Sequence, residues 1–323
     1  MRQTALAAFH DTAPVVQDFR ASVLEGLSSH PKRLEAKFFY DAEGSRLFDL
    51  ICELPEYYPT RTEIGIMERH GAEMAALIGR RCQLVELGSG SSVKVRPLLE
   101  RLEDPAGYVA VDISRDHLIA SADALARDYP ELEVMALCAD YTQGLAVPPP
   151  GGEGEFRRVG YFPGSTIGNM DPVEAQAFLV ALRPALTGGG LLIGVDLRKD
   201  PQVLHDAYND SQGVTAAFNL NLLARINREL DGGFDLAAFE HKAFYDEALG
   251  RIEMHLVSRR DQIVTVAGRR FAFAAGETIH TENSCKYSVE GFRDLARRAG
   301  YAPAACWTDD KNLFSVHYLA CPG

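Results

Sequence analysis

Short apolar runs alternate with amphipathic segments between residues 83 and 196. Strands are predicted at 83–87, 108–112, 132–138, 159–162 and 190–196, and helices at 92–103, 114–128 and 172–186. Strands without polar positions are typical of a parallel sheet that helices cover on both faces. The alternation therefore predicts an α/β fold, a doubly wound sheet with right-handed crossovers.

The pattern changes after residue 196. Residues 200–230 are predicted to be mostly helical, and 239–258 and 262–273 are predicted to form strands. A final helix is predicted at 289–299, followed by strands at 302–307 and 313–320. Within the first strand region, the segment Arg251–Leu256 alternates at period two, as a half-buried strand does. Because the last helix and strands return to the sheet pattern, residues 197–286 are interpreted as an insertion.

The N-terminal region is harder to interpret. Apolar residues at helical spacing predict a helix over Val15–Leu27, and another over Glu63–Ile78. Residues 37–63 fit neither periodicity and are rich in tyrosine and proline. They are interpreted either as a surface loop pinned by tyrosine packing or as a functional lid that carries Tyr40 and Tyr57.

These patterns predict two domains in a chain of 323 residues. A Rossmann-like domain comprises 61–196 plus 287–323, and a second, α+β domain comprises 1–60 plus 197–286. We expect the second domain to cover the mouth of the first, so that a substrate between them is shielded from water.

Composition excludes several classes of protein. An apolar fraction of 46% suffices for a core, and the net charge of −12 argues against nucleic-acid binding, which needs a basic surface. The six cysteines show no metal-ligand spacing and are expected to be reduced thiols. With no signal-peptide pattern and no apolar run long enough for a membrane span, we expect a cytoplasmic, monomeric protein that acts on a small molecule.

A glycine turn after the first strand is the leading candidate for a cofactor site. Gly88-Ser89-Gly90 follows apolar residues that end at Leu87, and glycine allows bare backbone to approach a ligand. Asp112, which ends the second strand 24 residues after Gly88, is placed to accept the ribose hydroxyls of a nucleoside.

Two cofactor classes fit such a turn. A dinucleotide fingerprint requires a third glycine where this chain has Val93. The acid Glu86 beside the turn suits a cationic head, such as the amino group and sulfonium of S-adenosyl-L-methionine, better than a diphosphate. S-adenosylmethionine is therefore favoured over a nicotinamide dinucleotide.

Two further strand ends carry candidate residues. Asp140 and Tyr141 follow the third strand, where the acid could accept from an adenine amine and the ring could stack on the base, although Asp140 could simply cap a turn. Asn169 follows the fourth strand and could bind an amino acid's carboxylate and amine, or could be the N-cap of the helix that starts at Pro172.

The chain resembles the histidine-specific Nα-methyltransferases of ergothioneine biosynthesis, which make hercynine. The resemblance extends from Lys37 to Trp307. It is carried by the motifs FFYDAEGSRLFD, LPEYYPTRTE, VELGSGSSVK, FPGSTIGN, GVTAAFNLNLLARINREL, RIEMHL and GETIHTENSCKY. It implies the class I methyltransferase form of the Rossmann-like sheet, with S-adenosyl-L-methionine as methyl donor and S-adenosyl-L-homocysteine as product.

The resemblance also implies roles at matching positions. The cofactor contacts that it implies are Gly88, Lys94, Asp112, Asp140 and Tyr141, and we expect Tyr40, Glu86, Ser89 and Gly90 to contact the cofactor as well. The expected substrate contacts are Tyr57, Asn169, Tyr208, Met254, Glu282 and Ser284, where Asn169 and Tyr208 hold the carboxylate and Glu282 and Ser284 contact the imidazole nitrogens. His255, Pro163 and Tyr141 depart from the family pattern.

The chemistry agrees with these roles. Methyl transfer from a sulfonium to a neutral amine is an in-line displacement that needs positioning and no metal. Water or a tyrosine must accept the amine proton, and Tyr40 is the candidate catalytic residue. The alternatives are an enzyme that methylates another amino acid, such as a tryptophan derivative, a non-catalytic S-adenosylmethionine-binding protein, and a nicotinamide oxidoreductase.

Overall fold

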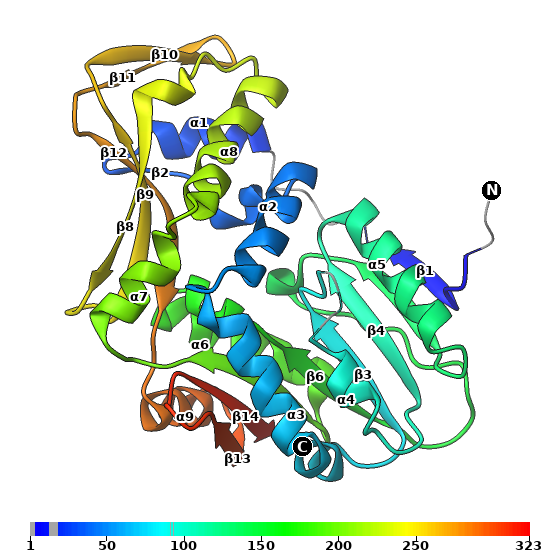
Figure 1. The fold of residues 1–323 in the computed structure, drawn as a ribbon. Helices are drawn as coiled ribbons and strands as arrows, with labels where there is room; N and C mark the ends of the chain where they lie inside the picture. Colours follow the sequence, from blue (N-terminus) through cyan, green and yellow to red (C-terminus); the bar gives the residue numbers. More distant parts are fainter. Residues whose placement is uncertain (1–3, 13–18, 91, 93) are drawn as a thin grey trace. The chain divides into compact units, whose positions relative to one another are not determined.

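The computed structural model describes residues 4–12, 19–90, 92 and 94–323, which form two compact units (Figure 1). Unit 1 takes in the described residues of Met1–Pro14, Pro59–Arg198 and Lys286–Gly323. Unit 2 takes in those of Val15–Tyr58 and Lys199–Cys285. Each unit is therefore built from segments that are distant in the sequence.

Unit 1 contains an eight-stranded sheet in the order β1-β5-β4-β3-β6-β7-β14-β13. Its strands are β1 (Ala8–Asp11), β3 (Cys82–Leu87), β4 (Gly107–Asp112), β5 (Val134–Cys138), β6 (Arg157–Phe162), β7 (Gly190–Asp196), β13 (Ala302–Thr308) and β14 (Phe314–Ala320). All neighbours from β1 to β7 are parallel, and β14 is antiparallel to both β7 and β13. The predicted class I methyltransferase sheet is confirmed.

The helices of unit 1 alternate with most of its strands along the chain. They are α3 (Tyr58–Ile78, whose first residue belongs to unit 2), α4 (Arg96–Leu99), α5 (Arg115–Asp128), α6 (Pro172–Leu186) and α9 (Val289–Arg298), with short 3₁₀ turns η2 (Tyr141–Gln143) and η3 (Thr166–Asn169). Every residue of β3 is buried, as expected of a strand with apolar side chains on both faces. Leu84 and Tyr108 of the central strands pack into one core with Ile66 and Met74 of α3.

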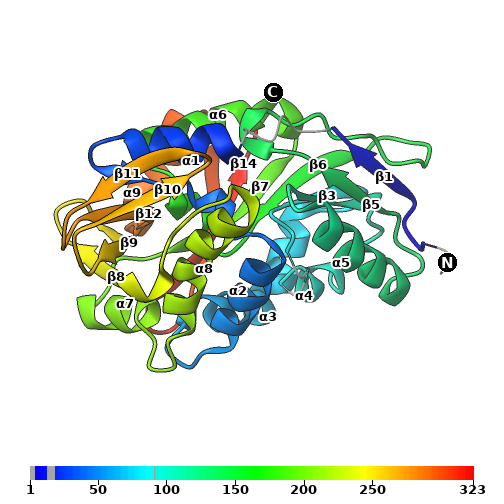
Figure 2. The same cartoon turned by 90° about the horizontal axis from the view of Figure 1, so that it is seen from above.

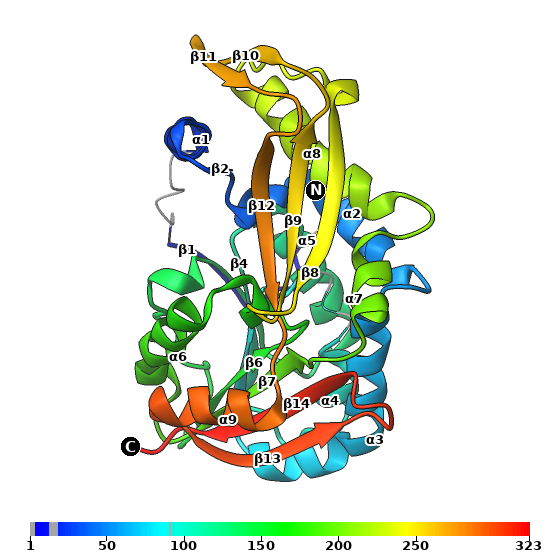
Figure 3. The ribbon, with the colours of Figure 1, turned by 90° about the vertical axis from the view of Figure 1, so that its left-hand side faces the viewer.

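Unit 2 is an α+β unit built on a four-stranded sheet in the order β2-β12-β9-β8 (Figure 3). Its strands are β2 (Lys32–Arg33), β8 (Phe239–Asp246), β9 (Arg251–Ser258) and β12 (Thr278–Cys285), with a separate hairpin of β10 (Gln262–Val266) and β11 (Arg269–Phe273). Its helices are α1 (Phe19–Ser28), α2 (Ala42–Glu53), α7 (Pro201–Tyr208) and α8 (Val214–Glu229), with 3₁₀ turns η1 (Ala36–Phe39) and η4 (Leu236–Ala238). Burial alternates along β9, because α8 packs against one face of the sheet.

Several sequence predictions were wrong. Residues 37–63 are mostly helical, with Asp41 as the N-cap of α2 and α3 beginning at Tyr58 instead of Glu63. The helix predicted over 92–103 is only the four residues of α4 in the structure. Residues 91 and 93 lie outside the described residues.

The N-terminal segment also differs from its prediction. Residues 1–60 were assigned to the second domain, but β1 pairs in parallel with β5 at the edge of the unit 1 sheet (Figure 2). Four residues are too few for a periodic pattern, so this strand was not predicted. Of the predicted helix over Val15–Leu27, the structure describes α1 from Phe19 onward.

Candidate functional site

The glycine turn of unit 1 is tied to the neighbouring strand β4. Gly88 and Gly90 have φ of +69° and +48°, a region that favours glycine. The main-chain nitrogens of Gly88 and Ser89 donate to the carbonyl of Val111, at 2.8 and 3.1 Å. Asp112 accepts from the Gly90 nitrogen at 3.4 Å and from another main-chain nitrogen at 2.8 Å. Three predicted cofactor residues and Asp112 therefore lie at one turn.

Glu86 is a buried carboxyl group beneath this turn. Its side chain is 1% exposed, and Oε2 accepts a hydrogen bond from the hydroxyl of Tyr108. Burial raises the pKa of Glu86 to about 8, which the Tyr108 hydrogen bond and the charge of Lys94 only partly oppose. A neighbouring cation would favour the ionised form of this group.

Lys94 has a carboxylate partner that the sequence did not indicate. Its Nζ lies 3.1 Å from Oε2 of Glu63, whose side chain is fully buried. Both oxygens of Glu63 also accept from the main-chain nitrogen of Gly164, at 3.0 and 2.9 Å. Gly164 has φ of +77°, and a Cβ there would lie 2.8 Å from Lys94 Nζ. Glu63 thus connects two motifs of the resemblance, 54–63 and 162–169, with the lysine.

Asp140 and Tyr141 lie at the carboxyl end of β5. Oδ1 of Asp140 accepts from the nitrogen and hydroxyl of Thr142, at 3.0 and 2.5 Å, so Asp140 does cap a turn. The Tyr141 ring packs against Phe162 and Phe178, with centroids 5.7 and 5.9 Å away. A Cβ added to Gly88 would lie 3.6 Å from the Tyr141 hydroxyl, which places this phenol beside the glycine turn.

Asn169 is the last residue of η3, in unit 1. The alternative that it caps the next helix is wrong. Asp171 is the N-cap of α6 and forms a capping box with Glu174, since its Oδ1 accepts from the main-chain nitrogens of Val173 and Glu174.

Tyr40 and Tyr57 belong to an aromatic cluster in unit 2. Phe48 lies 5.6 Å from Tyr40 and 6.3 Å from Tyr57, centroid to centroid, and Tyr40 also contacts Phe218 of α8 edge-on at 5.9 Å. Burial raises the pKa of Tyr57 well above its usual value, with smaller effects from Tyr208, Cys52, Tyr40 and Glu282. The Tyr57 phenol is therefore a hydrogen-bond donor near other predicted substrate residues and a poor base.

The remaining predicted substrate residues also lie in unit 2. The Tyr208 hydroxyl at the end of α7 donates to Ser284 Oγ at 2.7 Å. Glu282 and Ser284 are two residues apart in β12, and Glu282 is paired with Met254 of β9. Unit 2 therefore brings together Tyr57, Tyr208, Met254, Glu282 and Ser284.

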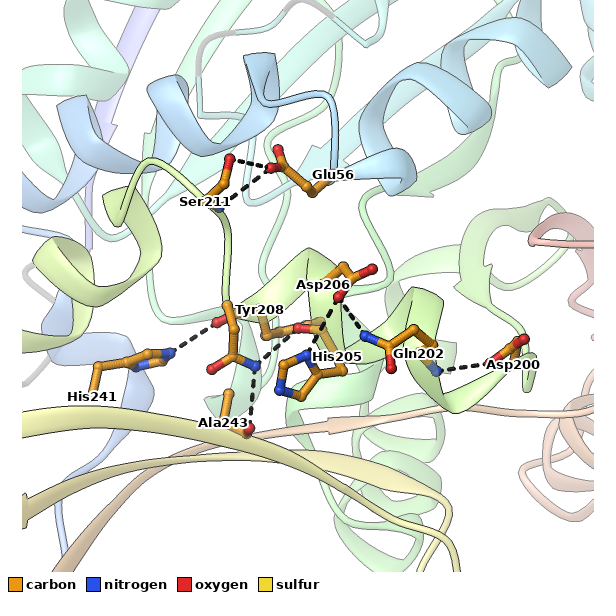
Figure 4. A network of polar contacts seen from close by, with 10 residues as sticks. Glu56, Asp200, Gln202, His205, Asp206, Tyr208, Ser211, His241 and Ala243 are labelled. Carbon is orange, nitrogen blue, oxygen red and sulfur yellow. Dashed lines mark hydrogen bonds and ion pairs between the residues drawn. The ribbon is translucent and has the colours of Figure 1, made fainter.

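A half-buried histidine holds the end of α7 (Figure 4). His241 Nε2 donates to the main-chain oxygen of Tyr208 at 2.8 Å, and its Nδ1 lies 2.9 Å from the amide nitrogen of Asn219. Burial lowers the pKa of His241, so the ring is neutral and Nδ1 accepts from Asn219. Ser211 bonds to Glu56 at 2.7 Å and anchors the loop that follows α7.

Comparison with known proteins identifies the family. The model of the S-adenosylmethionine-dependent, histidine-specific methyltransferases matches residues 19–321. The chain belongs to this family.

Named relatives match nearly the whole chain. Histidine N-alpha-methyltransferase of Mycolicibacterium smegmatis is 42% identical over 318 residues, 97% of this chain and 98% of the relative. The protein of the same name from Mycobacterium tuberculosis is 43% identical, over 93% and 94% of the two chains. Ergothioneine biosynthesis protein 1 of Neurospora crassa is 33% identical over 90% of this chain, which spans 33% of that longer protein.

One group in this methyltransferase has the composition of a metal site. In the part of the chain that the structure describes, Glu253, His255 and His280 place one possible ligand atom each within 4.8 Å of one another. Arg251 already holds Oε1 of Glu253 through two nitrogens, at 2.9 and 2.6 Å, and Nε2 of His255 lies 2.9 Å from Oε2 of Glu253. Because the arginine cation neutralises this carboxylate and both of its oxygens have partners, the group is interpreted as a charge network.

Sequence reasoning missed three residues that support the site: Glu63, Asn219 and His241. Glu63 closes one of the quoted motifs and Asn219 lies inside another, so the motifs contained the signal. Neither position could be assigned from spacing, because each contacts residues far away in the chain. His241 lies in a strand that carries no motif.

In the described part of the chain, no helix combines the length and apolar character that a membrane span requires.

Proposed function

We propose that this enzyme transfers methyl groups from S-adenosyl-L-methionine to the α-amine of L-histidine, up to the trimethylated product hercynine. The observation that carries the proposal is the polar cluster of unit 2. There, Tyr208 of α7 donates a hydrogen bond to Ser284 of β12, and Glu282 lies two residues before Ser284 on the same strand. The names of the two bacterial relatives support histidine as substrate. The fungal relative's name supports a place in ergothioneine biosynthesis.

Unit 1 is proposed to bind the cofactor. The turn at Gly88 and Gly90 offers main chain to the ligand, and Asp112 is the acid for the ribose hydroxyls. Tyr141, packed beside the turn, offers a ring to the adenine, and Asp140 its second carboxylate oxygen to the exocyclic amine. Glu86, with its raised pKa, would ionise next to the cationic head of the cofactor.

The reaction needs a neutral amine and a place for its proton. Nitrogen attacks the methyl carbon as the carbon–sulfur bond breaks, so the sulfonium becomes the neutral thioether of S-adenosyl-L-homocysteine. Before each transfer the amine gives up a proton to water or to the candidate base Tyr40, and after the third transfer the nitrogen keeps its positive charge as a quaternary ammonium. The protein contributes mainly orientation, with Asn169 and Tyr208 proposed to hold the substrate carboxylate.

Recognition of the imidazole requires a partner for each ring nitrogen. Glu282 and Ser284 supply a carboxylate and a hydroxyl, and a hydrogen bond to a charged group contributes about 1.5–3 kcal/mol. A site built for two polar contacts rejects a side chain that leaves them unpaired. This favours histidine over tryptophan derivatives, whose indole offers a single donor.

Mass spectrometry tests the proposal directly. L-histidine incubated with the enzyme and S-adenosylmethionine should gain the mass of one, two and finally three methyl groups, and fragmentation should place them on the α-nitrogen. Other free amino acids serve as controls. Release of S-adenosylhomocysteine with tryptophan and none with histidine would overturn the assignment.

We also propose that the enzyme works as a monomer in the cytoplasm. All six cysteines are thiols, as expected of a reducing compartment. Light scattering after size exclusion would determine the mass in solution, and a dimer would contradict the first part of this proposal.

A further inference from the structure

A β-bulge in β12 determines which of its side chains share the face of the sheet on which Tyr208 lies. His280 is paired with His255 of β9, but Glu282 is paired with Met254, so Thr281 is an extra residue in β12. Directly paired residues share a face of the sheet. The bulge therefore places Glu282 on the face of Met254, away from His280.

The bulge has a direct consequence for the proposed imidazole contacts. In a regular strand, side chains alternate, and Glu282 and Ser284 would lie on the same face as His280. With the extra residue, Ser284 instead reaches the hydroxyl of Tyr208, at 2.7 Å. Two predicted substrate residues thus depend on one irregularity of the backbone.

Side-chain hydrogen bonds hold the bulge in place. Thr281 is 1% exposed, and its hydroxyl lies 2.9 Å from Oδ1 of Asn219 in α8 and 3.0 Å from the main-chain oxygen of Met254. Asn219 is fully buried, and its amide nitrogen donates to the main-chain oxygen of His255 at 3.1 Å. Asn219 therefore bonds to both strands at the irregular position.

The same asparagine reaches the end of α7. Its amide nitrogen also donates to Nδ1 of His241, whose Nε2 donates to the main-chain oxygen of Tyr208. A continuous chain of hydrogen bonds thus runs from Thr281 through Asn219 and His241 to Tyr208. Its two ends are the bulge beside Glu282 and the residue that bonds to Ser284.

We propose that Thr281 and Asn219 are positioning residues for histidine recognition, because their hydrogen bond fixes the bulge that presents Glu282 and Ser284. The inference rests on the proposed function, since it concerns residues assigned to the substrate. Neither residue needs to touch the ligand. Their effect should be confined to histidine and spare the methyl donor.

The test is Thr281→Val in the full-length enzyme, with Kd for histidine and for S-adenosylmethionine measured by calorimetry and KM and kcat by turnover. Valine has the size and branching of threonine and suits a strand, so the variant removes only the hydroxyl. We expect histidine Kd and KM to rise about tenfold and S-adenosylmethionine Kd to stay within about twofold. Thr281→Ser, which restores a hydroxyl, should return histidine Kd to near the wild-type value.

Ser258→Ala is the matched control. Ser258 is a buried hydroxyl of the same sheet, on β9, and bonds to the main-chain oxygen of Arg260 at 2.8 Å, away from the bulge. The Ser258→Ala variant should have a lower unfolding midpoint and an unchanged histidine Kd. If Thr281→Val does not fold by circular dichroism, Thr281→Cys takes its place, because a thiol of similar size is only a weak donor.

The outcomes separate the two proposals. A wild-type enzyme that neither binds nor methylates histidine overturns the proposed function, and the inference with it. If the wild-type enzyme binds histidine, and the histidine Kd values of Thr281→Val and Thr281→Cys both stay within about twofold of the wild-type value, the inference alone is overturned. If Thr281→Val loses affinity for histidine and for S-adenosylmethionine equally, Thr281 has a general structural role, and this result also overturns the inference.

Discussion

The sheets of the two units use their residues in different ways. In unit 1, every residue of β3 is buried, and the proposed cofactor residues Gly88 and Gly90 lie where this strand ends. In unit 2, burial alternates along β9, and the proposed substrate residues Glu282 and Ser284 lie within a strand, β12. In the proposed function, the first sheet offers main chain to the cofactor, and the second offers side chains that discriminate between substrates. Substitutions in the core and at the glycine turn of unit 1 should therefore affect stability and cofactor binding, and substitutions in β12 of unit 2 should affect substrate choice.

The largest expected effect is on the stability of unit 1. Lys286 Nζ lies 2.7 Å from Asp196 Oδ2, and both side chains are 1% exposed. Lys286→Met leaves the carboxylate buried without this cation, which should lower the free energy of unfolding by about 3–5 kcal/mol. Urea titration followed by circular dichroism measures the loss.

Arg69→Met is the control for this variant. The Arg69–Asp310 pair also lies in unit 1, at 2.6 Å, but its side chains are 55% and 80% exposed. Its removal should cost less than about 1 kcal/mol. Equal losses in the two variants would show that burial does not determine the contribution of these ion pairs.

The second prediction concerns the pH dependence of unit 1. Burial raises the pKa of Glu86 from 4.5 to about 8, so folding favours the protonated carboxyl. Its contribution to stability is fully present below about pH 4.5 and is lost as the pH rises through about 8. Glu86→Gln keeps an acceptor for Tyr108 and does not titrate. The stability of the wild type minus that of the variant should therefore fall from about pH 5 to about pH 9, and a constant difference would refute the shifted pKa.

The third prediction concerns substrate binding in unit 2. Glu282→Gln removes the charge proposed to bind an imidazole nitrogen, and the loss of a charged hydrogen bond of about 1.5–3 kcal/mol weakens binding about 10- to 150-fold. Calorimetry should show this loss for histidine and little change for S-adenosylmethionine. Glu240→Gln on β8, where Glu240 forms an exposed pair with Arg259, should change neither affinity. Equal weakening of both ligands by Glu282→Gln would remove this residue from the imidazole site.

The same contrast explains what could be predicted from the sequence. The bounds predicted for α6 and β7 match the structure, because buried parallel strands and capped helices are encoded by local patterns. β12 was recognised only as a motif, since its bulge interrupts the alternation that identifies a strand. The partner of Lys94 was not found, because Glu63 is 31 positions away in the sequence and only folding brings them to 3.1 Å.

The smallest expected effect tests a single hydroxyl of unit 2. Tyr208→Phe removes the 2.7 Å hydrogen bond to Ser284 and leaves the ring in place. Because the wild-type hydroxyl must give up this bond to donate its one proton to the substrate carboxylate, the variant loses only the difference between a charged and a neutral hydrogen bond, about 1 kcal/mol, and histidine Kd should rise about fivefold. Tyr245→Phe removes a phenolic hydroxyl from β8, in the sheet that contains β12, and should leave histidine Kd unchanged. Since Ser284 keeps its place on β12 in the Tyr208 variant, the loss should also be smaller than that of Thr281→Val, which disturbs Glu282 and Ser284 together. If Tyr208→Phe binds histidine as the wild type does, Tyr208 contributes packing alone, and recognition depends on β12 without help from α7.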